Sequence, residues 1–320
     1  MKFLLNGPKL RKLGVLGMNA RNVDYIQKYN SRRSYPNADS KMRAKTLARK
    51  ADIAVPELYQ VVYSIGQFRS AIASVSDKQS FVIKPDRGSG GEGVLVLSRE
   101  NDGTLVTSSG RSVSDEELKM HVANTISGLY SLAGQPDRAL FEYKIEFDPV
   151  FEAISYQGVP DVRIIVFLGI PVLAMLRLPT KQSDGRANLH QGAVGVGIHM
   201  AEGKTTFGVS GMEQILEHPD TKNPITNVSI PHWDRMLDIA ASCYEVFELG
   251  YFGVDLVVDR YRGPMMLEVN VRPGLAIQLA NRVGLKSRLK MVEAQKELPT
   301  TVKDRIDFTK NVIAPIRIKN

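Results

Sequence analysis

The chain has 320 residues, of which 43% are hydrophobic and 24% charged, with a formal net charge of +8 and one cysteine, Cys243. This is the composition of an ordinary globular protein, and the length corresponds to about two domains or lobes. A lone cysteine cannot form an internal disulfide, which fits a reducing compartment and excludes a cysteine-based zinc site. No apolar run approaches the roughly 18 residues of a membrane span, and the first residues do not resemble a secretory signal. We therefore expect a cytoplasmic protein with no membrane span.

The positive charge is concentrated at the two ends of the chain. Residues 1–50 carry a net charge of +11 and residues 285–320 carry +5, while the part between them carries −8. Such a basic front suits nucleic acid, an anionic membrane surface or an acidic substrate, or it is simply a solvated helix face. Because aromatic residues are not interleaved with the basic ones and no nucleic-acid-binding signature occurs, we expect no nucleic-acid partner.

The predicted elements alternate between helices and strands. Residues 1–35 suit only short helices or coil. Helices are expected at 41–51, from Ser114 to about residue 129 and at 231–249, and strands at 79–85, 94–97, 139–145, 161–168, 252–259 and 264–270. Ser114 and Glu117 form a capping box, and Gly250 is placed to cap the third helix. With no internal repeat, this alternation indicates an α+β or α/β class.

A glycine-rich loop joins the strands at 79–85 and 94–97. Residues 88–93 include four glycines, which let backbone N–H groups approach an anion closely. The loop is not a Walker motif, because no Gly-Lys-Ser/Thr follows, and it is not a dinucleotide fingerprint, because a strand follows it. The alternative is an ordinary hairpin turn. Lys84, at the end of the preceding strand, favours a mobile flap over a phosphate.

The strongest single signal is a hairpin of two apolar strands joined by a four-residue turn. If Asp259 faces Pro264, then Asp255 lies opposite Glu268, and Asn270 follows on the same face. Two like charges that face each other between apolar neighbours are destabilising unless something neutralises them. An all-oxygen set of this kind suits Mg²⁺ or Mn²⁺ rather than zinc. The alternative is an exposed ribbon with unrelated acids, against which the apolar neighbours argue.

These motifs, in this order, resemble the ATP-grasp superfamily, and in particular its RimK-type glutamate ligases and the α-L-glutamate ligase-like proteins. The resemblance covers about residues 40–280. It rests on Ser40–Lys45 with Ile53–Pro56, Phe81–Pro85 with the glycine loop, Leu140–Ile145, Asp161–Arg163, Arg186–Gly192, and the acidic hairpin with Pro273-Gly274. Gln191 departs from the pattern, because RimK-type enzymes carry arginine there.

The resemblance implies an α+β, ATP-grasp fold in which two α+β lobes clasp ATP. We expect a basic N-terminal extension at 1–38, a first lobe with the flap at 39–141, and a second lobe with the metal-binding hairpin at 142–320. Related ligases usually carry a whole α/β domain before the first lysine, and that domain helps to bind the acceptor. Here only a short basic segment stands there, so the acceptor is held differently or a second subunit of a homo-oligomer completes the site.

The resemblance also implies a role for each matching residue. The implied catalytic residues are Lys84, Arg163 and Asn188. The nucleotide is held by Lys41, Lys84, Gly88, Ser89, Gly90, Gly91, Gly93, Glu142, Tyr143, Ile145 and Asp148, with Glu142 and the backbone of Tyr143 and Ile145 at the adenine. Glu146, Asp148 and Glu152 are the candidates for the ribose. Asp255, Glu268 and Asn270 fall on the magnesium ligands, and Arg177, Arg186, His190, Arg272 and Gly274 on the substrate side.

The implied activity is ATP-dependent carboxylate–amine ligation through an acyl phosphate, with Mg²⁺ or Mn²⁺ as the metal. The favoured reaction adds glutamate or another amino acid to a peptide-like acceptor, which the basic front would suit if it is acidic. A carbohydrate-linked acceptor is the alternative. Two other classes stay open, a catalytically silent ATP-binding sensor or scaffold and an anion-binding adaptor that uses the basic front.

Overall fold

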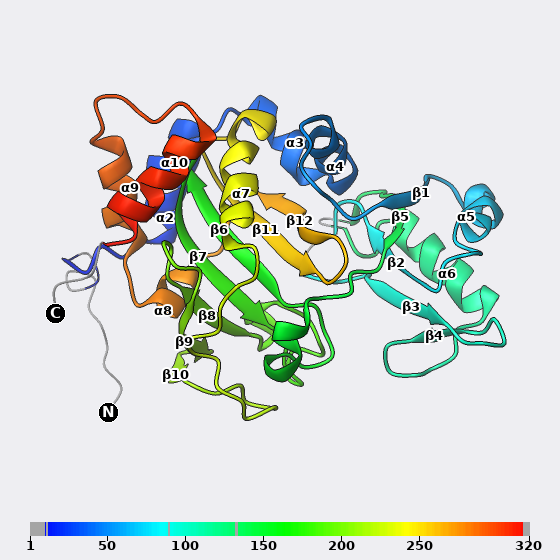
Figure 1. The fold of residues 1–320 in the computed structure, drawn as a ribbon. Coiled ribbons are helices and arrows are strands. Elements are labelled where there is room, and N and C mark those ends of the chain that lie inside the picture. The colour runs from blue at the N-terminus through cyan, green and yellow to red at the C-terminus, as the bar shows by residue number, and fades with distance from the viewer. Residues whose placement is uncertain (1–9, 11, 89, 132–133, 316–320) are drawn as a thin grey trace.

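The computed structural model describes residues 10, 12–88, 90–131 and 134–315, which form two sheets at opposite ends of the molecule (Figure 1). The small sheet has the order β1 (Leu58–Val62), β5 (Ala139–Tyr143), β2 (Ser80–Pro85), β3 (Leu95–Arg99) and β4 (Leu105–Thr107). The large sheet has the order β10 (Glu213–Ile215), β9 (Thr205–Ser210), β8 (Val194–Ile198), β7 (Ile170–Leu178), β6 (Asp161–Phe167), β11 (Tyr251–Asp259) and β12 (Gly263–Asn270). All neighbouring strands are antiparallel.

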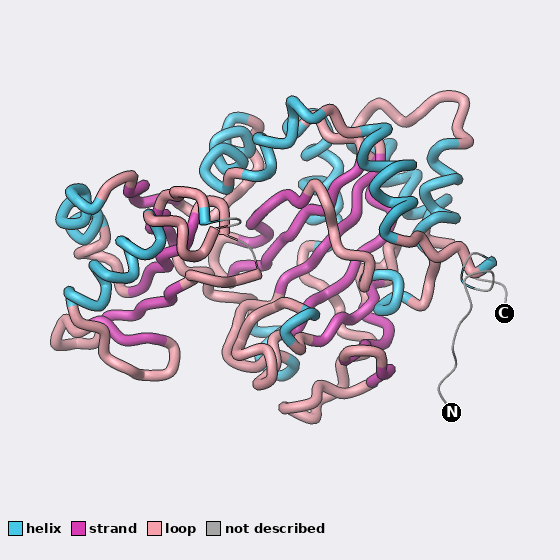
Figure 2. Tube along the Cα trace, turned by 180° about the vertical axis from the view of Figure 1, so that it is seen from behind, coloured by secondary structure: helices cyan, strands magenta, loops and turns pink. Residues whose placement is uncertain are grey.

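Helices cover both sheets (Figure 2). The small sheet packs against α5 (Phe68–Ser74) and α6 (Asp115–Ile126). The large sheet packs against α7 (Trp233–Phe247), α8 (Ile277–Asn281), α9 (Leu285–Glu293) and α10 (Val302–Phe308). The N-terminal segment contains α2 (Met18–Ala20), the π-helix η1 (Arg21–Gln27), η2 (Arg32–Ser34), α3 (Tyr35–Asp39) and α4 (Lys41–Lys50). Short turns complete the fold at η3 (Ile65–Gln67), η5 (Pro149–Ile154), η6 (Leu189–Gln191) and η7 (Thr309–Ile313). Among the described residues, no helix is both long and apolar enough to span a bilayer.

The helix ends test the capping predictions directly. Ser114 and Glu117 form the predicted capping box at the start of α6. The prediction that Gly250 caps α7 is wrong, because the helix ends at Glu248, which takes the left-handed φ of 54° itself. Gly250 has a different reason to be glycine. A Cβ there would come within 2.7 Å of the backbone oxygen of Tyr29.

The two faces of the large sheet bury different elements. Tyr251 and Asp255 share one face, because side chains alternate along β11. Tyr25 of η1 lies on that face, with its ring centroid 5.9 Å from that of Tyr251. On the other face, Cys243 of α7 contacts Met266. The π-helix η1 therefore lies on the face that carries Asp255, and α7 covers the opposite one.

The buried side chains form two main cores. The core of the large sheet includes Leu16 and Tyr25 from the N-terminal segment and Ala44 and Ala48 from α4. The core of the small sheet lies between that sheet, α5 and α6. The N-terminal segment and α4 are thus packed on the large sheet, although the sequence led us to expect an extension followed by a first lobe that includes α4. The lobe boundaries themselves stay a prediction.

His218 holds together the turn that follows β10. It is completely buried, and its Nε2 lies 2.9 Å from the carbonyl oxygen of Pro179. Its Nδ1 accepts from the backbone N–H groups of Asp220 and Thr221 at 3.2 and 3.3 Å. Protonation of Nδ1 would turn this acceptor into a donor that faces two backbone N–H groups, which is unfavourable. Burial lowers the pKa of His218, and the contact with Pro179 only partly opposes that lowering.

We predict that the free energy of unfolding falls as the pH drops below about 6.5, the ordinary pKa of histidine. Below this pH, His218 is protonated in the unfolded chain but stays neutral in the folded state. The free energy of unfolding therefore decreases by up to about 1.4 kcal/mol per pH unit. Urea denaturation at pH 7.5, 6.5 and 5.5 measures it. The stability difference between the wild type and His218→Leu should shrink towards low pH. A constant difference for His218→Leu would contradict this account.

Candidate active site

The acidic hairpin is β11 and β12, and it brings Asp255 opposite Glu268 as predicted. The register near the turn differs from the prediction, because Asp259 faces Gly263 rather than Pro264. A β-bulge after Asp255 adds one residue to β12 and restores the expected pairing at the carboxylates. The prediction that Asp255 and Glu268 lie opposite each other is therefore confirmed. The regular register assumed for the whole hairpin is wrong.

The three predicted metal ligands converge. The Nδ2 of Asn270 lies 3.2 Å from Oδ2 of Asp255 and 3.1 Å from Oε1 of Glu268, so this amide bridges the two carboxylates. Turning the amide over presents its oxygen to the same point. Among the described residues no three histidine, cysteine or acidic side chains gather as a metal site, so the donor set is two carboxylates and one amide. Hard oxygen donors of this kind fit Mg²⁺.

Two arginines neutralise the buried Asp255. Arg163, directly opposite it on β6, donates from Nε at 2.7 Å and from Nη2 at 2.6 Å. Arg177 on β7 donates to the same carboxylate at 2.6 Å and is also paired with Asp161. Burial opposes the charge of Asp255, but Arg163 and then Arg177 outweigh it and hold its pKa below the ordinary range. Both arginines predicted for the phosphate and substrate sides thus lie beside the metal ligands.

Lys41 connects the base of the flap to the acidic hairpin. Its Nζ donates to the carbonyl oxygen of Gly88 at 2.6 Å and to that of Asp86 at 3.3 Å. Burial lowers the pKa of Lys41, while the nearby charge of Glu268 opposes this lowering. The first predicted phosphate lysine therefore lies where the flap base meets the acidic hairpin.

Lys84 and Glu142, on the neighbouring strands β2 and β5, form a buried ion pair. Lys45 of α4 lies on the other side of the same carboxylate, 3.0 Å from Oε2 of Glu142. In this structure Glu142 therefore contacts two lysines, and its expected role at the adenine stays a prediction. Burial raises the pKa of Glu142, but Lys45 and Lys84 outweigh it and lower the pKa overall.

The flap folds back towards the large sheet. A Cβ at Gly90 would lie 3.3 Å from the side chain of Asn188, and one at Gly91 would lie 3.2 Å from that of Arg186. Gly90, Gly91 and Gly93 all have positive φ, which favours glycine. Ser89 lies outside the described residues. The flap thus meets the predicted substrate loop around residues 186–191.

In that loop, Asn188 accepts from the backbone N–H of His190 at 3.1 Å and starts the short helix η6. His190 itself is exposed. Oε1 of Gln191 is buried without a hydrogen-bond partner. The predicted roles of Asn188 and His190 in the reaction stay predictions, and of the two it is Asn188 that lies against the flap, at Gly90.

The hinge between the sheets is tied to the hairpin turn through Asp259. This buried carboxylate accepts from the hydroxyl of Tyr143 at 3.0 Å and from the backbone N–H of Glu146 at 2.9 Å. Burial, together with Asp259, raises the pKa of Tyr143 to about 12. Ile145 is buried against Val257 of β11. Asp148 accepts from the N–H of Val150 at the start of η5, so it serves as a helix cap in this structure.

The predicted substrate loop at Arg272 and Gly274 is held by the N-terminal segment. Nη1 of Arg21 donates to the carbonyl oxygen of Pro273 at 2.8 Å, and the Arg272 guanidinium lies over the ring of Tyr35. The position of a Cβ at Gly274 lies 3.9 Å from Nη1 of Arg163. The N-terminal segment thus contributes to this side of the site.

Residues 20–294 match the model of a protein family described as sugar-transfer associated ATP-grasp. The chain belongs to this family. The ATP-grasp fold expected from the sequence is therefore confirmed, while the RimK-type subtype stays a prediction. A comparison with curated proteins finds no match.

Several solved ATP-grasp structures resemble this family member at low identity. The ligase PsnB with its minimal precursor has 16% identity and a TM-score of 0.46, over 84% of this chain and 64% of PsnB. The D-cycloserine synthetase DcsG has 15% identity and a TM-score of 0.42, over 79% of this chain and 70% of that one. The VanG D-Ala:D-Ser ligase of Enterococcus faecalis has 14% identity and a TM-score of 0.46, over 80% of this chain and 61% of VanG. The ATP-grasp chain described here thus spans less than two thirds of PsnB.

Four residues of this ATP-grasp site were missed from the sequence. Lys45 was quoted only as the end of the Ser40–Lys45 motif and Arg21 was not singled out. Asp86, which accepts from the backbone N–H of Met42 at the start of α4, and Asp259 were given no role either. Lys45 carried a signal, because it follows Lys41 by one helical turn and therefore shares its face. Asp86 and Asp259 each end a strand just before a loop, which is a common place for a polar side chain that binds backbone N–H groups.

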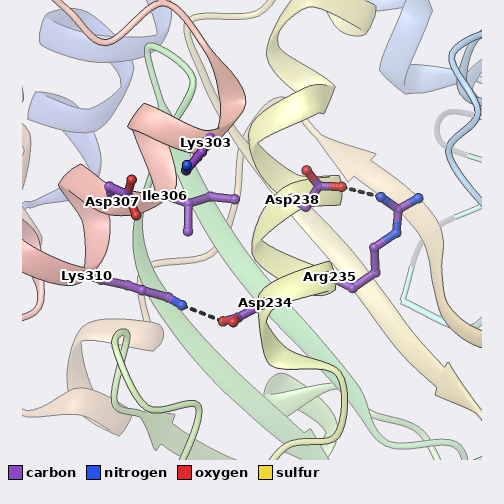
Figure 3. A pocket seen from close by; sticks show the side chains of 7 residues that line it. All are labelled: Asp234, Arg235, Asp238, Lys303, Ile306, Asp307 and Lys310. Carbon is purple, nitrogen blue, oxygen red and sulfur yellow. Dashed lines mark hydrogen bonds and ion pairs between the residues drawn. The ribbon is translucent and has the colours of Figure 1, made fainter.

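A surface groove of about 460 Å³ lies between α7 and α10 (Figure 3). Its walls are mostly charged, and two ion pairs lie in them, Lys310 with Asp234 and Arg235 with Asp238. Because α7 covers the face of the large sheet away from Asp255, this groove is not part of the candidate active site.

We predict that Gly88→Ala weakens nucleotide binding. Its Cβ would lie 2.2 Å from Cγ of Pro85, so the flap base must shift, and with it the carbonyl that holds Lys41. The loss should be about tenfold, the size of one charge-assisted hydrogen bond. Calorimetric titration with Mg·ADP measures it. Gly66→Ala, whose Cβ meets nothing nearer than Ser64 Oγ at 3.8 Å, is the control. Equal affinities in both variants would show that the flap base is not part of the site.

Proposed function

We propose that this ATP-grasp protein is an ATP-dependent carboxylate–amine ligase that forms an amide bond through an acyl phosphate. One observation carries the proposal. The acidic hairpin of the large sheet, with Asp255 and Glu268 bridged by Asn270, lies beside Lys41, and Lys41 in turn is held by the flap carbonyl of Gly88. A cation site next to a lysine and a glycine-rich flap suits a nucleotide triphosphate.

The adenine would lie at the hinge. Ile145, Val257 and Met265 form a separate buried apolar cluster there, with Tyr143 and Leu267 packed against it. Apolar side chains of this kind suit one face of a purine base, which binding sites typically bury against hydrophobic residues while a few polar groups fix its orientation. Glu146, Asp148 and Glu152 are near in sequence and stay the candidates for the ribose.

Mg²⁺ would be held by Asp255, Glu268 and Asn270, and when bound it polarises and neutralises the phosphate oxygens. The chain's own residues then position the reactants. Lys41 and Lys84 balance the phosphate charge on the side of the small sheet, and Arg163 does so from the large sheet. The glycines of the flap allow it to open for exchange and to close over the site, which excludes water.

In the proposed reaction, a substrate carboxylate attacks the γ-phosphate of ATP and forms an acyl phosphate and ADP. An amine then attacks the acyl carbon and releases phosphate. Arg186, beside Gly91 of the flap, and Arg272, over the ring of Tyr35, are the arginines that we propose for the substrate. Guanidinium groups suit a carboxylate because they can bind it through two parallel hydrogen bonds.

For the substrates, we propose glutamate or another amino acid and a peptide-like acceptor. A carbohydrate-linked acceptor is the second candidate, and the family description, with its reference to sugar transfer, favours it. The two candidates share the carboxylate–amine chemistry and differ only in what carries the acceptor group.

We predict ATP hydrolysis that depends on an amino acid or amino sugar. The measurement is phosphate release with Mg·ATP over the twenty amino acids and a set of amino sugars, followed by mass spectrometry of any product. A product heavier than the acceptor by one condensed unit supports ligation. Saturable ATP binding with no phosphate release for any pair would favour a silent nucleotide sensor instead.

We also predict that Asp255→Asn loses nearly all turnover, at least about a hundredfold, because the site loses a charged metal ligand and Arg163 loses the carboxylate that it is paired with. Asp307→Asn, an exposed change on α10, should keep wild-type turnover. Thermal denaturation separates loss of function from unfolding. Wild-type turnover in a folded Asp255→Asn variant would remove the hairpin from the mechanism.

A further inference from the structure

Lys45 is the most deeply buried lysine at the site, and its side chain is not accessible to a ligand. Its side chain is 1% exposed, its Nζ donates to the carbonyl oxygen of Pro56 at 3.1 Å, and it lies 3.0 Å from Oε2 of Glu142. A buried ammonium group is costly, so it is retained only where its charge is matched. Here the match is Glu142, which is itself 4% exposed on its side chain.

The same carboxylate also binds Lys84. Val82 is the strand partner of Glu142, and Lys84 follows Val82 by two residues, so Lys84 and Glu142 share one face of the small sheet. The three groups carry two positive charges and one negative charge. The side chain of Lys84 is 12% exposed against 1% for Lys45, so the surplus positive charge can face a ligand only at Lys84.

We propose that Lys45 is a positioning residue that frees the charge of Lys84 for the nucleotide phosphates by holding Glu142 from its other side. Without Lys45, Glu142 would have Lys84 as its single cation, and the pair would neutralise itself. With Lys45 in place, Glu142 is shared and orients Lys84 without cancelling it. This inference rests on the proposed function, because it assumes that Lys84 contacts a phosphate.

The position of α4 supports this arrangement. Ala44 and Ala48 pack in the core of the large sheet, while the first turn of the helix donates from the backbone N–H of Met42 to Asp86, two residues past Lys84, at 2.8 Å. The helix is therefore fixed at both sheets, and Lys45 is presented to Glu142 from a rigid element. A surface lysine would not hold a carboxylate at one defined place.

The test compares binding of Mg·ADP and of adenosine by calorimetry, since their affinity ratio isolates the phosphate contribution. Lys45→Gln removes the charge but keeps a donor for Pro56, and it should lower the ratio about tenfold. Lys45→Arg should keep the wild-type ratio. The double variant Lys45→Gln/Glu142→Gln should recover it, because Lys84 then has no competing carboxylate. Lys50→Gln, an exposed change at the end of the same helix, is the control.

If the role of Lys45 were purely structural, its loss would weaken the binding of Mg·ADP and of adenosine alike. The double variant would then bind both ligands more weakly than either single variant. An unchanged ratio in Lys45→Gln, or no recovery in the double variant, overturns the inference. If Lys45→Gln does not fold, Glu142→Gln decides alone: its ratio should be at least that of the wild type, and a lower ratio overturns the inference. Failure of the wild type to bind Mg·ADP would instead overturn the proposed function.

Discussion

Two carboxylates that face each other inside a protein need positive charge around them, and this requirement organises the whole site. Asp255 and Glu268 lie on adjacent central and edge strands, β11 and β12, and neither can move away from the other without breaking the hairpin. Arg163 and Arg177 supply two charges from the large sheet, and Lys41 lies close to Glu268. The remaining open side is where a metal-bound nucleotide would complete the balance.

The helix α4 connects this group to the small sheet. It shares its core with the large sheet, but its polar side chains reach β2, β5 and the flap. At the hinge, Asp259 connects the hairpin to the segment that follows β5, because it accepts from the backbone N–H of Glu146 and from the hydroxyl of Tyr143. The small sheet and the segment that follows it are thus joined to the rest of the molecule through Lys45 of α4 and through Asp259.

The features that the sequence predicted well depend on short-range rules. The capping box at Ser114 and the alternation along β11 and β12 involve neighbouring residues, so they can be identified from spacing alone. The pairing of Asp255 with Glu268 was predicted from a regular hairpin, and the structure reaches it through a bulge, which a two-residue period does not foresee. Local rules also placed the cap of α7 at Gly250, whereas Glu248 adopts the left-handed conformation there.

The features that the sequence did not predict depend on contacts between distant segments. Arg21 reaches Pro273 across 252 positions of the chain, and Lys45 meets Glu142 only because α4, which is packed on the large sheet, presents this side chain to β5 of the small sheet. Charge counting found a basic N-terminal segment but not that some of its residues, such as Arg21 and Lys45, are buried at the site. Such contacts follow from tertiary packing, and no periodicity in the sequence encodes them.

The most direct measurement is a crystal structure with a non-hydrolysable ATP analogue and Mn²⁺, whose anomalous scattering locates the metal. The account predicts a peak within coordination distance, roughly 2.0–2.3 Å, of oxygens of Asp255, Glu268 and Asn270, with the triphosphate between them and Lys41. A metal peak elsewhere, with these three side chains still joined only to each other and to the arginines, would contradict it.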